Sequence, residues 1–203
     1  MNITYLVKNV FRDDNRIEGF NENHLLLLVY LQKFTTFQGK IYFIFNFLFD
    51  DFKIDNKPLR KELHQCLRDL QKWGLINITN KVDFESINKN TIIILDGVQY
   101  EDNYTMLIAS EVDKILYSDE DIRSRKTMLY IYTLIVSRID GKGFCFPRLS
   151  MFKKDLSTTS DNRIINAIDK LKELGLIDYA KAGIIKDAKG RIYNANNIYV
   201  TTY

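Results

Sequence analysis

An internal repeat constrains the fold of this chain more than any other feature of its sequence. Four blocks recur in the same order, about 101 residues apart. They are Asn2–Val7 with Asn103–Ile108, His24–Tyr30 with Lys126–Tyr132, Gly39–Lys40 with Gly141–Lys142, and Leu63–Ile76 with Ile164–Ile177. A nearly constant offset over four blocks is hard to obtain by chance, so we expect two homologous domains, residues 1–101 and 102–203.

Each half predicts the same order of secondary structure: a short strand, a long helix, a β segment, a short helix, a third helix and a β-hairpin. The expected elements of the first half are 3–7, 23–35, 40–43, 45–52, a third helix capped by Asp55 or Asn56, and a hairpin of 75–84 with 91–95. Those of the second half are 105–108, 119–138, 143–146, 147–155, a third helix capped by Thr159 or Ser160, and a hairpin of 176–186 with 191–200. The predicted fold class is therefore α+β, mainly α, with one small domain present twice.

Local signals place the ends of the helices. Ser118, with Asp121 three residues later, predicts a capping box before the long helix of the second half. Pro58 and Pro147 fit the first turn of a helix, where a backbone N–H has no helical partner. Each third helix has an apolar stripe at helical spacing and ends before a glycine. The stripes and glycines are Leu59, Leu63, Cys66, Leu67, Leu70 and Gly74 in the first half and Ile164, Ala167, Ile168, Leu171, Leu174 and Gly175 in the second.

The composition indicates a soluble cytoplasmic protein without a disulfide framework. The chain has 203 residues, of which 46% are hydrophobic and 27% charged, and its formal net charge is +3. Its two cysteines form no CxxC pair, which argues against a zinc ribbon. The apolar runs 25–31 and 41–49 are too short to cross a membrane, so we interpret them as core segments. The slightly basic charge permits a nucleic-acid partner without requiring one.

The sequence offers no recognisable catalytic machinery. It contains no GxxxxGKT, HExxH or GxSxG motif. His24 and His64 lie on predicted helices without a second ligand at metal-binding spacing. The acidic clusters at 13–14, 50–51 and 119–121 are better explained as helix-start charges and solvated loops than as magnesium ligands. We therefore expect no enzymatic activity, metal, cofactor or small-molecule substrate.

The second half carries the pattern of a helix-turn-helix followed by a β-hairpin. This pattern runs from Phe146-Pro147-Arg148-Leu149 through Leu156-Ser157 to Leu-x-x-x-Gly-Leu-Ile at 171–177, and the first half repeats the last motif at 70–76. The chain thus resembles bacterial winged helix-turn-helix proteins. Two such domains in one small chain, each opened by a strand, also resemble the replication-initiation proteins of plasmids and phages of low-GC bacteria. The resemblance implies binding to double-stranded DNA.

The resemblance also implies a DNA-binding face on each third helix, because this helix enters the major groove while basic neighbours hold phosphates. In the first half the face is Lys57, Arg60, Lys61, His64, Gln65 and Arg68, and in the second it is Asn162, Arg163, Asn166 and Lys170, beside Asp161, Ile165 and Asp169. The expected phosphate contacts are Arg148, Lys153 and Lys154 on the preceding helix and Lys181, Lys186, Lys189 and Arg191 in the wing. Ile165 would touch a thymine methyl or pack against a partner.

Three functions stay open on the sequence. The first is sequence-specific double-stranded DNA binding in replication initiation or its control on a plasmid or phage. The second is transcriptional regulation through the same contacts. The third is a winged-helix pair that binds protein and not DNA, which exposure of Phe47 and Phe49 beside the third helix would favour. A homodimer is compatible with all three but is not required, because the repeat already supplies two domains in one monomer.

Overall fold

The computed structural model describes residues 4–12, 16–139, 143–145, 147–180, 184–186, 192–194 and 198–202, with 184–186 and 192–194 described by their backbone alone. The chain divides into two compact units. Unit 1 is Met1–Lys8 with Gly19–Ala109, and unit 2 is Asn9–Glu18 with Ser110–Tyr203. The division differs from the predicted halves in two segments: residues 9–18 belong to unit 2, and residues 102–109 belong to unit 1. Both units combine helices with small sheets, which is compatible with the predicted α+β class.

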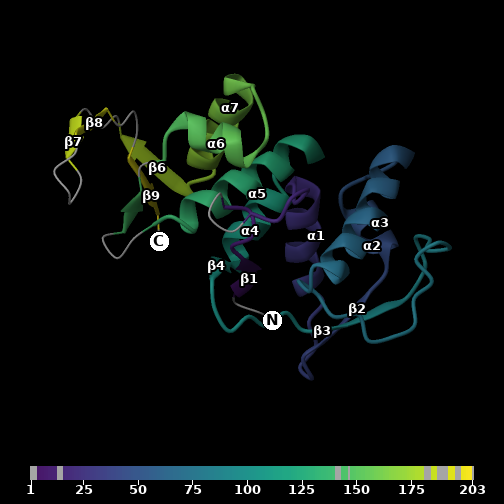
Figure 1. Cartoon of the computed structure of the whole chain (residues 1–203). Coiled ribbons are helices and arrows are strands. Elements are labelled where there is room, and N and C mark those ends of the chain that lie inside the picture. Colours follow the sequence, from purple (N-terminus) through teal and green to yellow (C-terminus); the bar gives the residue numbers. More distant parts are fainter. Residues whose placement is uncertain are drawn as a thin grey trace. The chain divides into compact units, whose positions relative to one another are not determined.

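The order of elements follows the sequence closely (Figure 1). Unit 1 contains β1 (Thr4–Lys8), α1 (Glu22–Gln32), β2 (Lys40–Phe43), α2 (Phe45–Asp51), α3 (Lys57–Lys72), β3 (Ile93–Asp96) and β4 (Tyr104–Ile108). Unit 2 contains α4 (Ala109–Leu116), α5 (Ile122–Val136), β5 (Phe144–Cys145), α6 (Leu149–Asp155), α7 (Asp161–Glu173), β6 (Ile177–Ala180), β7 (Ile184–Lys186), β8 (Ile192–Asn194) and β9 (Ile198–Thr201). The first residue of α4, Ala109, still belongs to unit 1. The sequence predicts all of these helices except α4.

Strand β1 pairs antiparallel with β4, and its other edge is covered by one side chain. The Oε1 atom of Gln32 accepts the Leu6 backbone N–H at 2.8 Å. The Nε2 atom of Gln32 donates to the carbonyls of Leu6 at 2.9 Å and Leu28 at 3.1 Å. Gln32 is buried, and its amide supplies the hydrogen bonds that a neighbouring strand would otherwise provide to the Leu6 backbone.

We expect Gln32→Leu to destabilise unit 1 by roughly 2–4 kcal/mol, because a buried backbone group that loses its partner costs about 1–3 kcal/mol. Urea unfolding followed by the fluorescence of Trp73, the one tryptophan of the chain, measures this loss. The control is Gln38→Leu, since Gln38 is exposed. If both variants change the free energy of unfolding by less than about 0.5 kcal/mol, the Gln32 amide does not stabilise the strand edge.

Helix α1 forms the apolar centre of unit 1. Every residue from Leu25 to Leu31 is fully buried, which confirms this run as a core segment and explains its lack of a one-sided apolar pattern. Asn21 fixes the start of the helix, because its side chain accepts the backbone N–H groups of Asn23 and His24. Helix α3 packs against α1 (Figure 1). In the described part of the chain, no helix is long and apolar enough to cross a membrane.

The predicted hairpin of 75–84 with 91–95 forms only in part. Strand β3 pairs along its length with β2. The segment after α3 pairs with β3 only around the bridge between Ile78 and Leu95, where the Asp96 N–H donates to the Asn77 carbonyl at 2.9 Å and the Thr79 N–H to the Ile94 carbonyl at 2.8 Å. Beyond this bridge, the side chain of Asn80 accepts the Ile94 N–H at 2.8 Å. A side-chain amide thus takes the place of a backbone ladder bond, and regular pairing stops before the loop at 81–91.

Two predicted helix starts in unit 2 are also wrong. Ser118 donates its hydroxyl to the Ile115 carbonyl at 3.0 Å, at the end of α4. The N-cap of α5 is Asp121, whose carboxylate accepts the Ser124 N–H at 2.7 Å. Pro147 lies two residues before α6 rather than in its first turn, because the residue between them is an extended N-cap.

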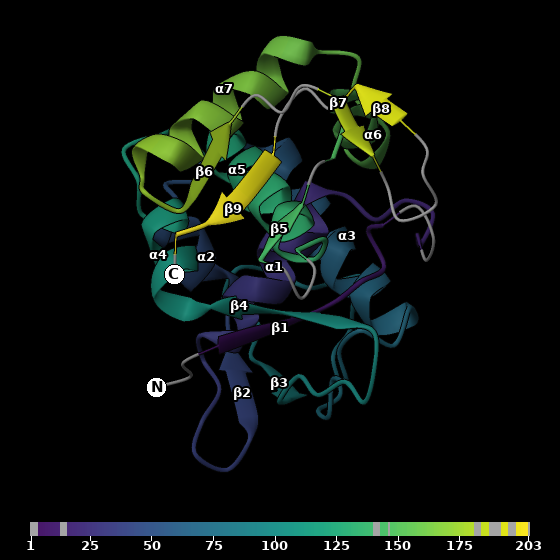
Figure 2. The same cartoon turned by 90° about the vertical axis from the view of Figure 1, so that its left-hand side faces the viewer.

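The main sheet of unit 2 has β9 between β5 and β6 (Figure 2). Strands β6 and β9 are antiparallel, with Ile177 opposite Thr201. Strands β7 and β8 form a second antiparallel pair, with Ile184 opposite Asn194. These pairings confirm the partners of the hairpin predicted for 176–186 and 191–200.

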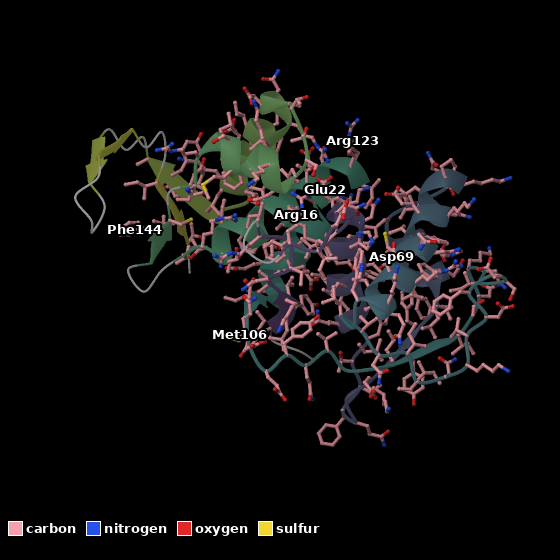
Figure 3. The ribbon with its side chains drawn as sticks, viewed as in Figure 1. Arg16, Glu22, Asp69, Met106, Arg123 and Phe144 are labelled. Carbon is pink, nitrogen blue, oxygen red and sulfur yellow. The ribbon has the colours of Figure 1, made fainter. Side chains whose placement is uncertain are left out.

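The N-terminal segment of unit 2 comes from the first half of the chain. Phe11 is fully buried and meets Tyr130 edge-on, with the ring centroids 6.0 Å apart. Arg16, labelled in Figure 3, donates to the Lys154 carbonyl at 2.7 Å and the Ser157 hydroxyl at 2.6 Å. The segment therefore contributes both apolar packing and hydrogen bonds to unit 2.

A buried ion pair joins the segment just after α5 to the last residue of α6. The Nη2 atom of Arg138 lies 2.7 Å from the Asp155 Oδ2 atom, and the two side chains are 12% and 1% exposed. The Tyr130 hydroxyl donates to the Asp155 carbonyl at 3.2 Å. Both side chains of this pair are more deeply buried than those of the Lys153–Asp161 and Lys170–Glu120 pairs of the same unit.

Candidate nucleic-acid interface

Helix α3 carries the largest group of predicted DNA-contacting residues. Asn56 is its N-cap, with the side-chain oxygen 3.2 Å from the Leu59 N–H, and Pro58 lies in the first turn as predicted. The buried face is Leu63, Cys66, Leu67 and Leu70. The helix ends before Gly74, whose φ of +68° is the left-handed conformation expected there. The opposite face of α3 is therefore presented to solvent.

The three cations in the first half of this face differ in their surroundings. Lys57 and Lys61 are exposed and form no ion pair with a described residue. Arg60 places its guanidinium over the Phe49 ring, 4.9 Å from the centroid. Its Nε atom also donates to the Ile54 carbonyl at 2.6 Å. Arg60 is thus held against unit 1 itself, whereas the two lysines extend into solvent.

The middle of the face is less polar than its sequence suggests. His64 packs against Phe45 and Phe49, with ring centroids 4.3 and 5.8 Å away. Burial lowers the pKa of His64 below its ordinary value, so the ring is neutral near pH 7. Gln65 is exposed and donates its amide to Asp69 at 2.9 Å. This part of α3 therefore offers neutral hydrogen-bonding groups rather than charge.

Arg68 is engaged by the loop that follows α3. Its Nη2 atom donates to the Phe84 carbonyl at 2.8 Å, and its Nη1 atom lies 3.1 Å from the Glu85 Oε1 atom. The guanidinium also lies over the Phe84 ring, 5.6 Å from the centroid. A pocket of about 650 Å³ lies against the middle of α3 and is lined by Lys61, Arg68 and this loop. The loop residues are not singled out by the sequence pattern.

Asp69 also attaches α3 to α1. Figure 3 labels this residue on α3, and its carboxylate lies 3.4 Å from the His24 Nε2 atom. The His24 ring packs against Trp73 at 4.8 Å and Phe20 at 5.5 Å between centroids. Burial is the largest influence on the pKa of His24 and lowers it, although Asp69 acts in the opposite direction. His24 is therefore a neutral core residue that helps to fix the position of α3.

The two histidines make the stability of unit 1 dependent on pH. Because both pKa values are lowered from 6.5, the unfolded chain binds more protons than the folded chain just below pH 6.5. Their contribution to stability is complete above pH 6.5 and is lost as the pH falls through the folded-state pKa values. Urea unfolding between pH 5 and pH 8, followed by Trp73 fluorescence, should show this loss, and His24→Gln should reduce the slope. A slope that is the same in both proteins would contradict this role of His24.

The corresponding cations of α7 are engaged within unit 2. Arg163 donates from Nε and Nη2 to the Thr127 hydroxyl at 3.1 and 2.9 Å. Lys170 lies 3.2 Å from a Glu120 oxygen and 3.0 Å from a Glu173 oxygen. A pocket of about 610 Å³ is lined by all of these residues. Lys170 is therefore partly neutralised by two carboxylates, whereas Arg163 is held by a neutral hydroxyl and keeps its charge.

The other predicted contacts of unit 2 lie on or near α6 and α7. Lys153 pairs with Asp161 at 2.5 Å, so it too is partly neutralised. Exposed residues of this set are Arg148, Lys154, Asn162, Ile165 and Asn166. The side chains predicted for the wing, those of Lys181, Lys186, Lys189 and Arg191, lie outside the described residues.

The pocket beside α7 also includes residues that the sequence reasoning does not select. Arg123 and Ser124 line it from the first turn of α5, and Figure 3 labels Arg123 there. Both are in a helix that the sequence predicts, but their position opposite α7 follows from the packing of two helices far apart in the chain. No local signal identifies that contact.

The described residues contain no group of three or more His, Cys, Asp or Glu side chains that could hold a metal ion. Cys66 and Cys145 are both buried. Cys66 lies on the buried face of α3, which confirms its predicted place in the core. Cys145 directs its thiol toward the Ile135 carbonyl at 3.6 Å.

No protein-family model matches the chain, and no curated protein matches it. A functional assignment therefore depends on the order of the elements and on the charge of the exposed helix surfaces.

Proposed function

We propose that the chain binds double-stranded DNA and that α3 is its principal major-groove helix. The observation that carries this proposal is the difference in charge between α3 and α7. Helix α3 has five basic and two acidic residues, whereas α7 has three of each. Because attraction to phosphates supplies much of the affinity for DNA, the helix with the basic excess is the better candidate.

The order of the elements supports a winged-helix interpretation of both units. In unit 1 a long helix is followed by a strand, a short helix, the helix α3 and the strand β3. Unit 2 repeats this order with α5, β5, α6, α7 and the strands β6 and β9. The parallel order also supports an internal duplication, although the segment Asn9–Glu18 belongs to unit 2 and makes each unit discontinuous in sequence.

The solvent face of α3 suits a major groove. Lys57 and Lys61 are four residues apart and therefore share one side of the helix. Gln65 lies one further turn along that side, and an amide in this position pairs well with adenine. The three residues span about 12 Å along the helix axis. In this arrangement the lysines contact phosphates, and Gln65 exchanges its bond to Asp69 for a base.

Reversing both lysine charges tests this interface. We expect Lys57→Glu/Lys61→Glu to weaken binding to duplex DNA by about tenfold or more at 0.1 M salt, and to reduce the slope of log K against log salt by about 2. Fluorescence polarisation with labelled duplex fragments measures both quantities.

The matched control is Lys153→Glu/Lys170→Glu, which makes the same charge change at cations already paired within unit 2. We expect this variant to lose less affinity than the α3 variant. Equal losses would show that α3 is not the principal contact. Absence of binding at low salt by the folded wild-type protein would overturn the DNA-binding proposal.

A protein-binding function is the second candidate, and exposed apolar side chains of unit 1 favour it. Tyr42 is 49% exposed and Ile92 is 61% exposed. Phe47 is also exposed, but it stacks on Phe34 with the ring centroids 5.6 Å apart, and Phe49 is buried. Exposure of both phenylalanines would favour this function, but only Phe47 is exposed. Concentration-dependent association that Tyr42→Ser abolishes would support a protein contact at β2.

The biological setting requires a separate measurement, because replication and transcription proteins use the same kinds of DNA contact. We propose replication initiation or its control as the first possibility and transcriptional regulation as the second. Selection of bound fragments from the source genome separates them. Fragments from an origin support the first role, and fragments from promoters support the second.

A further inference from the structure

We propose that Arg68 is a phosphate-binding residue and that Glu85 competes with phosphate for its guanidinium. The proposal rests on DNA binding by α3 and identifies an acidic residue that regulates the same surface. In the absence of DNA, Glu85 occupies one side of Arg68. In the complex, a phosphate oxygen takes its place.

The contacts of Arg68 are of two kinds. The Phe84 carbonyl and ring are neutral contacts that orient the guanidinium. The Glu85 carboxylate is a charged contact, 3.1 Å from the Nη1 atom, and its side chain is 85% exposed. An exposed ion pair is weak and exchanges readily. Because a guanidinium binds phosphate as well as carboxylate, phosphate can replace Glu85 while the Phe84 contacts remain.

The loop holds Glu85 in this position through a local turn. The Asp83 carboxylate accepts the Glu85 N–H at 3.0 Å and the Ser86 hydroxyl at 2.8 Å. Hydrogen bonds from Ser86 and from the Glu85 N–H lower the pKa of Asp83, which favours the ionised form that makes them. The backbone at Glu85 is therefore set by its neighbours, and a swing of the Glu85 side chain alone is enough to release Arg68.

The pocket beside α3 provides room for a phosphate. It has a volume of about 650 Å³ and is lined by Lys61 and Arg68 from the helix and by Glu85 and Ile87 from the loop. Lys61 lies on the surface of α3 that we propose faces DNA. A DNA strand bound there would bring its phosphates close to both Lys61 and Arg68. Glu62 also lines the pocket, but it forms no ion pair with a described residue.

Glu62 therefore provides a matched control for Glu85. We expect Glu85→Gln to raise the affinity for duplex DNA by about twofold to fivefold, the range that corresponds to an exposed ion pair. The salt slope should stay nearly the same, because Arg68 contacts a phosphate in both complexes. Glu62→Gln should give a smaller gain and no change of slope. In an Arg68→Gln background, Glu85→Gln should give no more gain than Glu62→Gln.

A second measurement does not depend on DNA. Titration of the folded full chain with inorganic phosphate, followed by the NMR signal of the Arg68 Nε–H, should saturate at lower phosphate in Glu85→Gln than in wild type. Equal gains from Glu85→Gln and Glu62→Gln, with unchanged phosphate titrations, would overturn the competition. A phosphate response without any DNA binding would retain the anion site at Arg68 and reject DNA binding by α3. Thermal unfolding of each variant shows whether the fold is intact.

Discussion

Arg138→Ala is expected to destabilise unit 2 by about 3–5 kcal/mol, because it leaves a buried carboxylate without its charged partner. The Asp155 side chain is 1% exposed, and the Arg138 Nη2 atom lies 2.7 Å from it. Water cannot replace the guanidinium at such a site without opening the contact between the region after α5 and α6. Urea unfolding measures the loss, and hydrogen exchange of the amides in α5 and α6 localises it.

Two further variants separate a lost charge partner from lost packing. Arg138→Met/Asp155→Leu removes both charges and should recover much of the stability, because apolar groups of similar size can replace a buried ion pair. Lys170→Ala removes an exposed partner of Glu120 and should cause little change. A loss below about 1 kcal/mol for Arg138→Ala would contradict the importance of the buried pair.

Phe11→Ala is expected to cost about 3–5 kcal/mol, because a fully buried phenylalanine leaves a cavity when it is truncated. The structure also predicts where the loss occurs. Phe11 packs against Tyr130 of α5, although it lies in the first half of the sequence. Hydrogen exchange should therefore increase more in α5 than in α3.

The matched control is Phe37→Ala, since Phe37 is fully exposed in the turn before β2. We expect it to leave the free energy of unfolding unchanged to within about 0.5 kcal/mol. Faster exchange in α3 with no change in α5 after Phe11→Ala would show that the N-terminal segment belongs to unit 1.

Helix α3 shows which features the sequence predicts well. Its N-cap, the proline in its first turn, its apolar stripe and its terminal glycine are all local signals. The structure selects Asn56 as the cap and confirms the proline, the glycine and the stripe from Leu63 to Leu70, while Leu59 is only half-buried. Helix α4 could also have been predicted. Val112, Ile115 and Leu116 are buried at helical spacing. The segment is short, however, and lies between two of the repeated blocks on which the predicted order of elements rests.

The state of the predicted DNA-contacting side chains depends on contacts that no local pattern contains. In the sequence, Arg163 and Lys170 are as plausible DNA contacts as Lys57. In the structure they bond to Thr127 on α5 and to Glu120 before it. Arg68 meets a loop more than a dozen residues away. The exchange of Asn9–Glu18 between the units is likewise a long-range effect. Tertiary packing, rather than residue type, decides which cations remain accessible.

The most direct test of the central claim is the affinity of the wild-type chain for duplex DNA as a function of salt. We predict that log K falls linearly with log salt over about 50–300 mM, with a slope that is smaller in Lys57→Glu/Lys61→Glu. That result would establish phosphate contacts at α3. Binding that is independent of salt, or no binding by the folded protein at 50 mM salt, would contradict the proposed function.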